Sequence, residues 1–252
     1  MSIFGTFLSG GFDSSTIVAM MSKQVNEKFK TITINFENGV DETKMASLVA
    51  EQFGTDHMVL NAGKKEIIES LEGIFLNLDE PISDNSIFPT LILSKLAVNN
   101  GLKVILNGTG GDELFGGYLR YQPRKLFNYP IYELPVLLKR NMSWFISIFD
   151  KNISEIIKNP SYDYYRGISG INISVLNQIL RDKNDIEKLV LLIKRKYQAK
   201  IEIANSNVKS FMSLDFTDYL VNDVLALLDK MTMAVSLEGR VPFLDNNIID
   251  FA

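Results

Sequence analysis

Two glycine-rich segments hold the residues of this sequence that are best suited to bind a phosphate chain and a metal ion. The first reads Ser9-Gly10-Gly11-Phe12-Asp13-Ser14-Ser15. Its glycines allow backbone angles that turn several N–H groups toward one point, and its serine hydroxyls add further donors. Asp13 would repel phosphate oxygens unless a cation lay between them, and Mg²⁺ prefers oxygen ligands. The segment lacks the Gly-Lys-Ser/Thr ending of a Walker A loop, so a phosphate site here would be of another type.

The second segment carries another acidic group after a turn of glycines. It reads Asn107-Gly108-Thr109-Gly110-Gly111-Asp112-Glu113-Leu114-Phe115-Gly116-Gly117-Tyr118. In an open parallel sheet, ligands bind outside the carboxyl ends of the strands, so two loops at that edge would bring Asp13 and Asp112 together. Two carboxylates and the phosphate oxygens of a nucleotide form an all-oxygen Mg²⁺ site. Each loop alone could be a plain surface turn, and the pair together favours a nucleotide site.

The elements that must position these loops follow an alternating pattern in the first 120 residues. Short β-like runs alternate with helical periodicity, as in a parallel α/β sheet. We expect strands at residues 3–8, 31–36, 57–60 and 103–106. We expect helices from Ser14, from Asp41, over residues 67–78 and over residues 89–98. The helix from Asp41 is expected to face inward with Met45, Leu48, Val49 and Phe53 and to end at Gly54.

The second half of the chain has a different pattern. From Tyr121 onward we find helical periodicity and no clear strand. We therefore predict a nucleotide-binding α/β core at residues 1–120 and a mainly helical part at residues 121–252. The predicted fold class is α/β, with an open, mostly parallel, doubly wound sheet and a C-terminal helical subdomain. The chain ends inside an apolar helical pattern, so we expect a piece that is truncated at its C-terminus.

Composition excludes several classes of function. The 252 residues are 46% hydrophobic and 22% charged with a net charge of −4, so nothing favours nucleic acid or an anionic membrane as a partner. The chain has no cysteine, which excludes disulfides, thiolate metal sites and cysteine nucleophiles within it. Its apolar stretches are too short to span a bilayer, and its first residues do not form a signal peptide. We expect a cytoplasmic enzyme or binding module.

Several motifs, in this order, resemble a known family. Residues 9–14 match the PP-loop of ATP pyrophosphatases. Together with Asp79-Glu80-Pro81, residues 108–118 and residues 229–245, they resemble the C-terminal synthetase domain of the glutamine-hydrolysing asparagine synthases. The similarity runs from about Phe7 to the last residue. The resemblance implies a PP-loop fold of the adenine-nucleotide α-hydrolase type.

The resemblance also implies ATP-dependent formation of an amide bond. A substrate carboxylate, by default the β-carboxylate of aspartate, would attack the α-phosphorus of ATP to give an acyl-adenylate and pyrophosphate. Ammonia or an amine would then displace AMP. The implied cofactors are ATP and Mg²⁺, and the implied partners are these small molecules, with no nucleic acid and no membrane. A separate glutaminase and a homodimer stay open.

The resemblance assigns roles to residues at matching positions. The implied catalytic residues are Asp13, Asp112 and Thr109, and Asp13 with Asp112 would hold Mg²⁺. The implied nucleotide contacts are Leu8, Ser9, Gly10, Gly11, Asp13, Ser14, Ser15, Ile34, Asn107 and Gly108, of which Leu8 and Ile34 match contacts to the adenosine. The expected substrate contacts are Asp84, Ser86, Gly111, Glu113 and Asp229.

The sequence departs from the family pattern in three ways. Asparagine synthases commonly carry a glutamate at the position of Thr109, and threonine cannot act as a general base near neutral pH. This keeps open an amidoligase or cyclase that acts on another carboxylate, and a non-catalytic ATP-binding relative. The glutaminase domain is absent from these residues, and a family lysine would lie beyond their end. We therefore expect these 252 residues alone to bind ATP–Mg²⁺ weakly and to turn over poorly or not at all.

Two further side-chain expectations concern charge and the single histidine. Glu238 and Arg240 are expected to form a buried ion pair beside Val241 and Phe243, with a structural or a substrate-binding role. His57 is expected near a strand end, without a chemical role.

Overall fold

The protein is described here by a computed structural model that covers residues 3–37, 41–82, 84–118, 121, 178, 185, 188–189, 191–192, 195–196 and 208–252. The chain divides into two compact units. The first comprises Met1–Leu114 and Leu220–Ala252, and the second comprises Phe115–Tyr219. The first unit is thus made from two separate stretches of sequence. Most of the helical pattern expected after residue 121, including residues 186, 193 and 197, lies outside the described residues.

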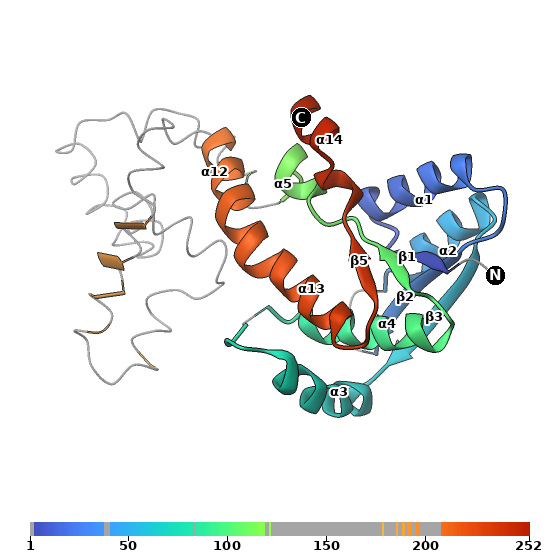
Figure 1. Ribbon diagram of the computed structural model, residues 1–252, viewed down its shortest axis with the longest axis horizontal. Helices are drawn as coiled ribbons and strands as arrows, with labels where there is room; N and C mark the ends of the chain where they lie inside the picture. The colour runs from blue at the N-terminus through green and yellow to red at the C-terminus, as the bar shows by residue number, and fades with distance from the viewer. Residues whose placement is uncertain are drawn as a thin grey trace, which may run out of the picture. The chain divides into compact units, whose positions relative to one another are not determined.

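The first unit contains a five-stranded parallel sheet with the order β3-β2-β1-β4-β5 (Figure 1). The strands are β1 Phe4–Phe7, β2 Lys30–Phe36, β3 Asp56–Ala62, β4 Val104–Leu106 and β5 Glu238–Arg240. β1 lies at the centre, where Thr6 is in register with Thr31 of β2 on one side and with Leu106 of β4 on the other. This arrangement confirms the predicted α/β fold class and the four expected strands.

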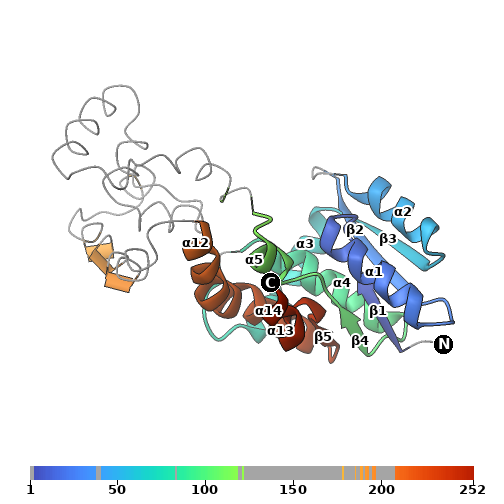
Figure 2. The same ribbon diagram turned by 90° about the horizontal axis from the view of Figure 1, so that it is seen from above.

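Helices cover both faces of the sheet (Figure 2). The described helices of this unit are α1 Phe12–Gln24, α2 Thr43–Gln52, α3 Lys64–Asn77, α4 Ile87–Asn99, the short α5 Gly111–Phe115, α13 Ala226–Met233 and α14 Asn246–Phe251, with a 3₁₀ turn η3 at Pro242–Leu244. Leu8, Val18 and Ala46 belong to a buried cluster that joins α1 and α2 to one face. Ile32 and Leu93 belong to a second buried cluster that joins α4 to the other face. No helix within the described residues combines the length and the apolarity that a membrane span requires.

The second unit is described mainly at its two ends. It contains α12 Val208–Leu214 and the start of a π-helix, η2 Asp215–Leu225, whose residues from Leu220 onward belong to the first unit. Tyr121 is buried, and its hydroxyl donates a hydrogen bond to the buried carboxylate of Asp215. The ring of Tyr118 meets that of Tyr121 edge to face, with 5.8 Å between the ring centroids. A buried carboxylate needs such a donor because burial without a partner costs several kcal/mol, roughly 2–7 for a polar group.

The expected inner face of α2 is confirmed for Val49 and Phe53, which pack partly buried against the cluster under α1 and α2, and is wrong for Met45 and Leu48. Ala46 and Ala50 are the buried residues of this helix, whereas Met45 and Leu48 are 56% and 59% exposed. The small alanine side chains let the helix backbone approach the sheet and the first glycine loop. Side-chain hydrophobicity alone pointed to the larger residues, because the close approach of two backbones leaves no sign in the periodicity.

The expectation of no strand after Tyr121 is also wrong. β5 is short and pairs in parallel with β4, with Glu238 opposite Val104 and Arg240 opposite Leu106. Its sequence, Glu-Gly-Arg, has no β-branched or aromatic residue and two exposed charged residues. Such a strand forms because a partner edge is available, and local β-propensity does not predict it.

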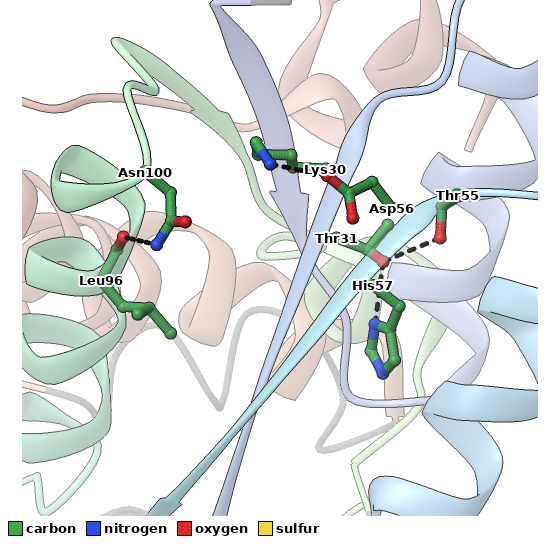
Figure 3. Close-up of polar contacts among 7 residues, drawn as sticks. All are labelled: Lys30, Thr31, Thr55, Asp56, His57, Leu96 and Asn100. Atoms are coloured by element: carbon green, nitrogen blue, oxygen red, sulfur yellow. Dashed lines mark hydrogen bonds and ion pairs between the residues drawn. The ribbon is translucent and has the colours of Figure 1, made fainter.

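A polar network links β2 and β3 (Figure 3). The Thr31 hydroxyl lies 2.9 Å from Nδ1 of His57 and 2.9 Å from the Thr55 hydroxyl. Nε2 of His57 is buried and has no hydrogen-bond partner in the described part of the chain. Burial lowers the pKa of His57, partly opposed by its hydrogen bond with Thr31. His57 therefore has a structural position at the start of β3, beside the ion pair of Lys30 with Asp56.

Candidate functional site

The first glycine loop is closed by its own hydroxyl groups. The Ser9 hydroxyl lies 3.0 Å from the Ser14 hydroxyl, and the Gly11 N–H donates to Ser9 Oγ at 3.2 Å. Ser14 Oγ also donates to the Gly11 carbonyl at 3.2 Å and accepts from the Ser9 N–H at the same distance. These bonds fix the loop before any ligand arrives, and they commit the Ser14 hydroxyl to the loop itself.

Gly10 is the position where this loop requires glycine. Its φ is +79°, and a Cβ there would lie 2.6 Å from the backbone nitrogen of Ala46. A side chain is therefore excluded both by the left-handed backbone and by the first turn of α2. The exposure of Met45 and the burial of Ala46 follow from the same close contact.

The loop leads directly into the N-terminus of α1. Gly11 is the N-cap and provides no side-chain hydrogen bond, and α1 begins at Phe12, two residues before the expected start. The first N–H groups of a helix have no intrahelical acceptor, and together with the helix dipole they favour an anion. Ser15 Oγ adds a buried polar atom with no partner among the described residues. Asp13 lies in this same first turn.

The second loop starts where β4 ends. The Asn107 N–H donates to the Arg240 carbonyl at 2.8 Å, so β5 holds the start of the loop. Asn107 Oδ1 accepts hydrogen bonds from both the N–H and the hydroxyl of Thr109, each at 3.0 Å. This is an Asx turn, in which the asparagine side chain fixes the next two residues. The Thr109 hydroxyl proton is therefore already committed to Asn107.

The two glycine loops touch each other at the carboxyl ends of β1 and β4. A Cβ on Gly111 would lie 2.5 Å from Cγ of Asp13, and a Cβ on Gly108 would lie 3.0 Å from Cβ of Asp13. Burial raises the pKa of Asp13, and the negative charge of Asp112 raises it further. The expectation that Asp13 and Asp112 lie near one another is thus confirmed.

The chain after β5 supports the second loop. Gly110 has a φ of +95°, and a Cβ there would lie 2.5 Å from a methyl carbon of Leu244 in η3. The ion pair of Glu238 with Arg240 is present, with 2.6 Å between Oε1 of Glu238 and Nη2 of Arg240. The expected burial of this pair is wrong, because the side chains are 53% and 66% exposed. They lie on an edge strand, where solvent satisfies both charges.

The donor set at the meeting point fits a magnesium ion. Within the described ranges, no group of three or more His, Cys, Asp or Glu side chains is arranged to hold a metal. Asp13 and Asp112 provide two carboxylates whose mutual repulsion, seen in the raised pKa of Asp13, a divalent cation would relieve. Mg²⁺ is commonly held by one or two carboxylates, with phosphate oxygens and waters as the remaining ligands.

The two residues expected at the adenosine are on different faces of the sheet. Leu8 is 1% exposed as a whole residue and packs in the cluster under α1 and α2, so neither its side chain nor its backbone is open to a ligand in this structure. Its hydrogen bonds run from its N–H to the Ile32 carbonyl at 2.9 Å and from the Thr33 hydroxyl to its own carbonyl. Ile34 lies within β2 opposite Leu60 and packs partly buried against the cluster under α4.

The expected substrate residues are scattered. Gly111 and the 2% exposed Glu113 lie in α5 at the second loop. Asp84 accepts a hydrogen bond from the Ser86 N–H at 2.8 Å before α4, and Asp229 is exposed on α13. None of the described contacts joins Asp84, Ser86 or Asp229 to the glycine loops.

One acidic residue near these positions was not predicted. Burial raises the pKa of Asp223, in η2, and the charge of Asp84 raises it further. Asp223 and Asp84 are therefore neighbours although 138 positions separate them in the sequence. A single acidic residue in a helical segment gives no local signal of such a pairing.

The sequence is similar to known proteins of one family. The family model for asparagine synthase matches residues 3–252. The chain is 32% identical to asparagine synthetase [glutamine-hydrolyzing] 1 of Bacillus subtilis (strain 168) over 98% of its own length and 40% of that protein. It is 31% identical to a putative asparagine synthetase [glutamine-hydrolyzing] of Mycobacterium bovis over 98% of its length and 38% of that protein.

Another relative matches a shorter part of the chain. A putative asparagine synthetase [glutamine-hydrolyzing] 2 of Methanocaldococcus jannaschii is 39% identical over 46% of this chain and 23% of that protein. The chain thus spans about two fifths of the length of the curated relatives that match it throughout. The family model and these similarities show that the chain belongs to the asparagine synthase family.

Proposed function

We propose that this chain is the synthetase domain of an asparagine-synthase-type ligase, which activates a substrate carboxylate with ATP. One observation carries the proposal: the carboxylate of Asp13 lies against Gly111 and beside Asp112, so two loops that are about a hundred residues apart in the sequence meet at one point. Membership of the family supports the same activity. The default substrate is the β-carboxylate of aspartate.

In this proposal the first loop binds the departing pyrophosphate. The N–H groups at the start of α1 and the hydroxyl of Ser15 face no competing acceptor among the described groups, so they can donate to phosphate oxygens. The Ser9–Ser14 hydrogen bonds hold the loop in that shape. Fixed donors stabilise the charge that develops on a leaving group without reorganising during the reaction.

Asp13 and Asp112 are the proposed ligands of Mg²⁺. When bound, the ion neutralises charge on the phosphates of ATP. The contact with Gly111 fixes where the Asp13 carboxylate lies. The Asx turn formed by the side chain of Asn107 fixes the start of the second loop. The role of the protein is therefore to position the two carboxylates before ATP binds.

The proposed chemistry has two balanced steps. A carboxylate oxygen forms a bond to the α-phosphorus, the bond from that phosphorus to the bridging oxygen breaks, and pyrophosphate leaves with the electron pair. The nitrogen of ammonia or an amine then attacks the acyl carbon, the bond from carbon to AMP breaks, and the nitrogen loses a proton. Thr109 cannot accept this proton, because it is not basic and its hydroxyl already donates to Asn107.

The Thr109 geometry favours a second candidate within the same family. An amidoligase that uses another carboxylate, or a more reactive amine, does not need a base at this position. Its adenylation step would use the same two loops. A relative that binds ATP without chemistry would also keep them.

One assay separates these functions. Exchange of labelled pyrophosphate into ATP is measured with the longest polypeptide that the gene encodes, in the presence of aspartate or of other amino acids and carboxylic acids. Exchange that depends on aspartate supports asparagine synthesis, and exchange that depends on another acid supports the second candidate. Absence of exchange with every acid, in a protein that still binds ATP–Mg²⁺, would contradict adenylation altogether.

A further inference from the structure

A cavity of about 410 Å³ lies in the first unit, away from the glycine loops. It is bounded by the C-terminal half of α3, the connection to α4 and the first turn of α4. Its apolar wall includes Leu71, Phe75, Leu78, Ile82 and Phe88. Cavities of this size, in the range of roughly 300–1,000 Å³, accept small ligands or large side chains. No residue of either glycine loop lines it.

The cavity continues an apolar stripe along α3. Ile68 and Phe75 are 65% and 72% exposed, and Leu71 between them completes the spacing of three and four residues that places side chains on one helix face. The opposite face of α3 packs on α4, where a Cβ on Gly73 would lie 3.2 Å from a methyl carbon of Leu91. Figure 1 shows α3 and α4 side by side. The stripe thus has no partner within the described residues.

The rim of this cavity is acidic. Asp79, Glu80 and Asp84 all line it. Asp79 is paired with Lys230 of α13, whereas neither Glu80 nor Asp84 takes part in an ion pair with a described residue. Asp223 adds negative charge near Asp84. The surface therefore combines an apolar floor with excess negative charge.

We propose that this surface, formed by Ile68, Leu71, Phe75 and the cavity with its acidic rim, docks a basic amphipathic helix of a partner protein. A leucine or aromatic side chain of the partner fills the cavity, and lysine or arginine residues on either side of it face Glu80 and Asp84. Helix-in-groove recognition uses apolar anchors at this spacing, and opposite charges set the orientation and the rate of encounter. The acidic rim would repel an anionic lipid surface. It would also repel the same rim of a second copy of this chain, whose net charge is −4.

The test uses a fluorescent synthetic peptide of about 15 residues, long enough to form a helix. The peptide carries leucines on one face and lysines beside them, and two controls carry the same residues in scrambled order or glutamates in place of the lysines. Fluorescence anisotropy measures the binding of each peptide to the 252-residue chain. We expect the basic amphipathic peptide to bind and both controls to bind at least about tenfold more weakly, a difference of about 1.4 kcal/mol.

Two neighbouring residues of α3 give a matched pair of variants. Phe75 and Leu76 are 72% and 77% exposed, but only Phe75 lines the cavity. Phe75→Ser is expected to weaken the peptide at least about tenfold, whereas Leu76→Ser changes its affinity less than about twofold. Glu80→Lys should weaken it as well, with exposed Glu51→Lys on α2 as its control. Melting temperatures show that each variant is folded.

Several results would overturn the proposal. Failure of the basic peptide to bind, equal binding of the scrambled peptide, or equal losses in Phe75→Ser and Leu76→Ser would each do so. Unchanged binding of the peptide to Glu80→Lys would show that the acidic rim does not attract basic residues, and a basic partner helix would then be refuted. Preferred binding to vesicles of anionic lipid, or dimerisation that Phe75→Ser abolishes, would assign the surface to an occupant that the proposal excludes.

Discussion

Gly111→Ala is the substitution that tests the proposed site most directly. The added Cβ would lie 2.5 Å from Cγ and from Oδ2 of Asp13. Ordinary contacts between non-bonded atoms begin near 3.5 Å, so the carboxylate must move by about 1 Å. The atoms that move belong to the end of a side chain, so the fold can accommodate the change. The proposed metal ligand, however, is displaced from its position.

The expected effects on binding and on stability differ. Losing the group that orients a metal ligand typically weakens the metal about 10–100-fold, so we expect ATP–Mg²⁺ to bind to Gly111→Ala about 10–100-fold more weakly. This corresponds to about 1.4–2.7 kcal/mol. Alanine within a helix is favoured over glycine by roughly 0.5–1 kcal/mol, which offsets part of the strain. The free energy of unfolding is therefore expected to change by less than about 1 kcal/mol.

Gly101→Ala is the control, because it is expected to lower stability and to leave the affinity for ATP–Mg²⁺ unchanged. Gly101 has a φ of +80°, and a Cβ there would meet no atom within 4 Å. Alanine in this left-handed conformation costs roughly 1–2 kcal/mol of stability. It touches neither loop, so ATP–Mg²⁺ should bind as it does to the unchanged chain. Isothermal titration calorimetry with and without EDTA gives the affinities, and urea unfolding gives the stabilities.

The proposed role of Gly111 is refuted if Gly111→Ala binds ATP–Mg²⁺ within about threefold of the unchanged chain while its stability is retained. The contact between Gly111 and Asp13 would then have no part in binding the nucleotide. Equal losses of affinity in Gly101→Ala and Gly111→Ala would also refute it, because they would show a general effect of destabilisation.

Three further predictions concern charge. Burial and the charge of Asp112 raise the folded-state pKa of Asp13 above 3.8, so the folded chain holds this proton more tightly than the unfolded chain does. The chain therefore loses stability as the pH rises from 3.8 through the folded-state pKa. Without Mg²⁺, Asp13→Asn should have a higher melting temperature than the unchanged chain at pH 7 and the same melting temperature well below pH 3.8. Burial lowers the folded-state pKa of His57 below 6.5, so the folded chain is destabilised when the pH falls below 6.5 toward the folded-state pKa. Urea unfolding at several pH values measures this loss of stability, and His57→Asn should remove it. Glu238→Gln breaks an exposed ion pair with Arg240 and should change the free energy of unfolding by less than about 1 kcal/mol, and a larger loss would show that the pair is buried in solution.

Most of the sheet could be predicted from the sequence because most of its strands have a residue pattern typical of β-structure. β2 is rich in β-branched residues, and β1 and β4 are apolar runs that end at glycine loops. Parallel strands place their following loops at one edge, so the meeting of Asp13 and Asp112 followed from the fold class. Gly108 and Gly111, the neighbours that fix Asp13, are part of the second glycine motif, but the motif does not reveal that they contact Asp13, because the contact joins residues about a hundred positions apart.

The errors have a common physical origin. The inner face of α2 depends on how closely its backbone approaches Gly10, and hydrophobic periodicity carries no information on that distance. β5 forms because β4 has a free edge, and the residues Glu238-Gly239-Arg240 alone do not predict a strand. The neighbouring pair of Asp84 and Asp223 depends on long-range packing. Each of these features is decided by a partner that is remote in the sequence.

The pairing of β4 with β5 has a consequence for the order in which the chain acquires its structure on the ribosome. β4 is complete when Leu106 emerges, but its outer edge is covered only after Arg240, more than a hundred residues later. At roughly 5–20 residues per second, that edge waits on the order of 10 s. During this interval the nascent chain exposes unpaired N–H and C=O groups that can pair with another chain. Release of the polypeptide before residue 238 would make the exposure permanent, so incomplete translation products are expected to aggregate.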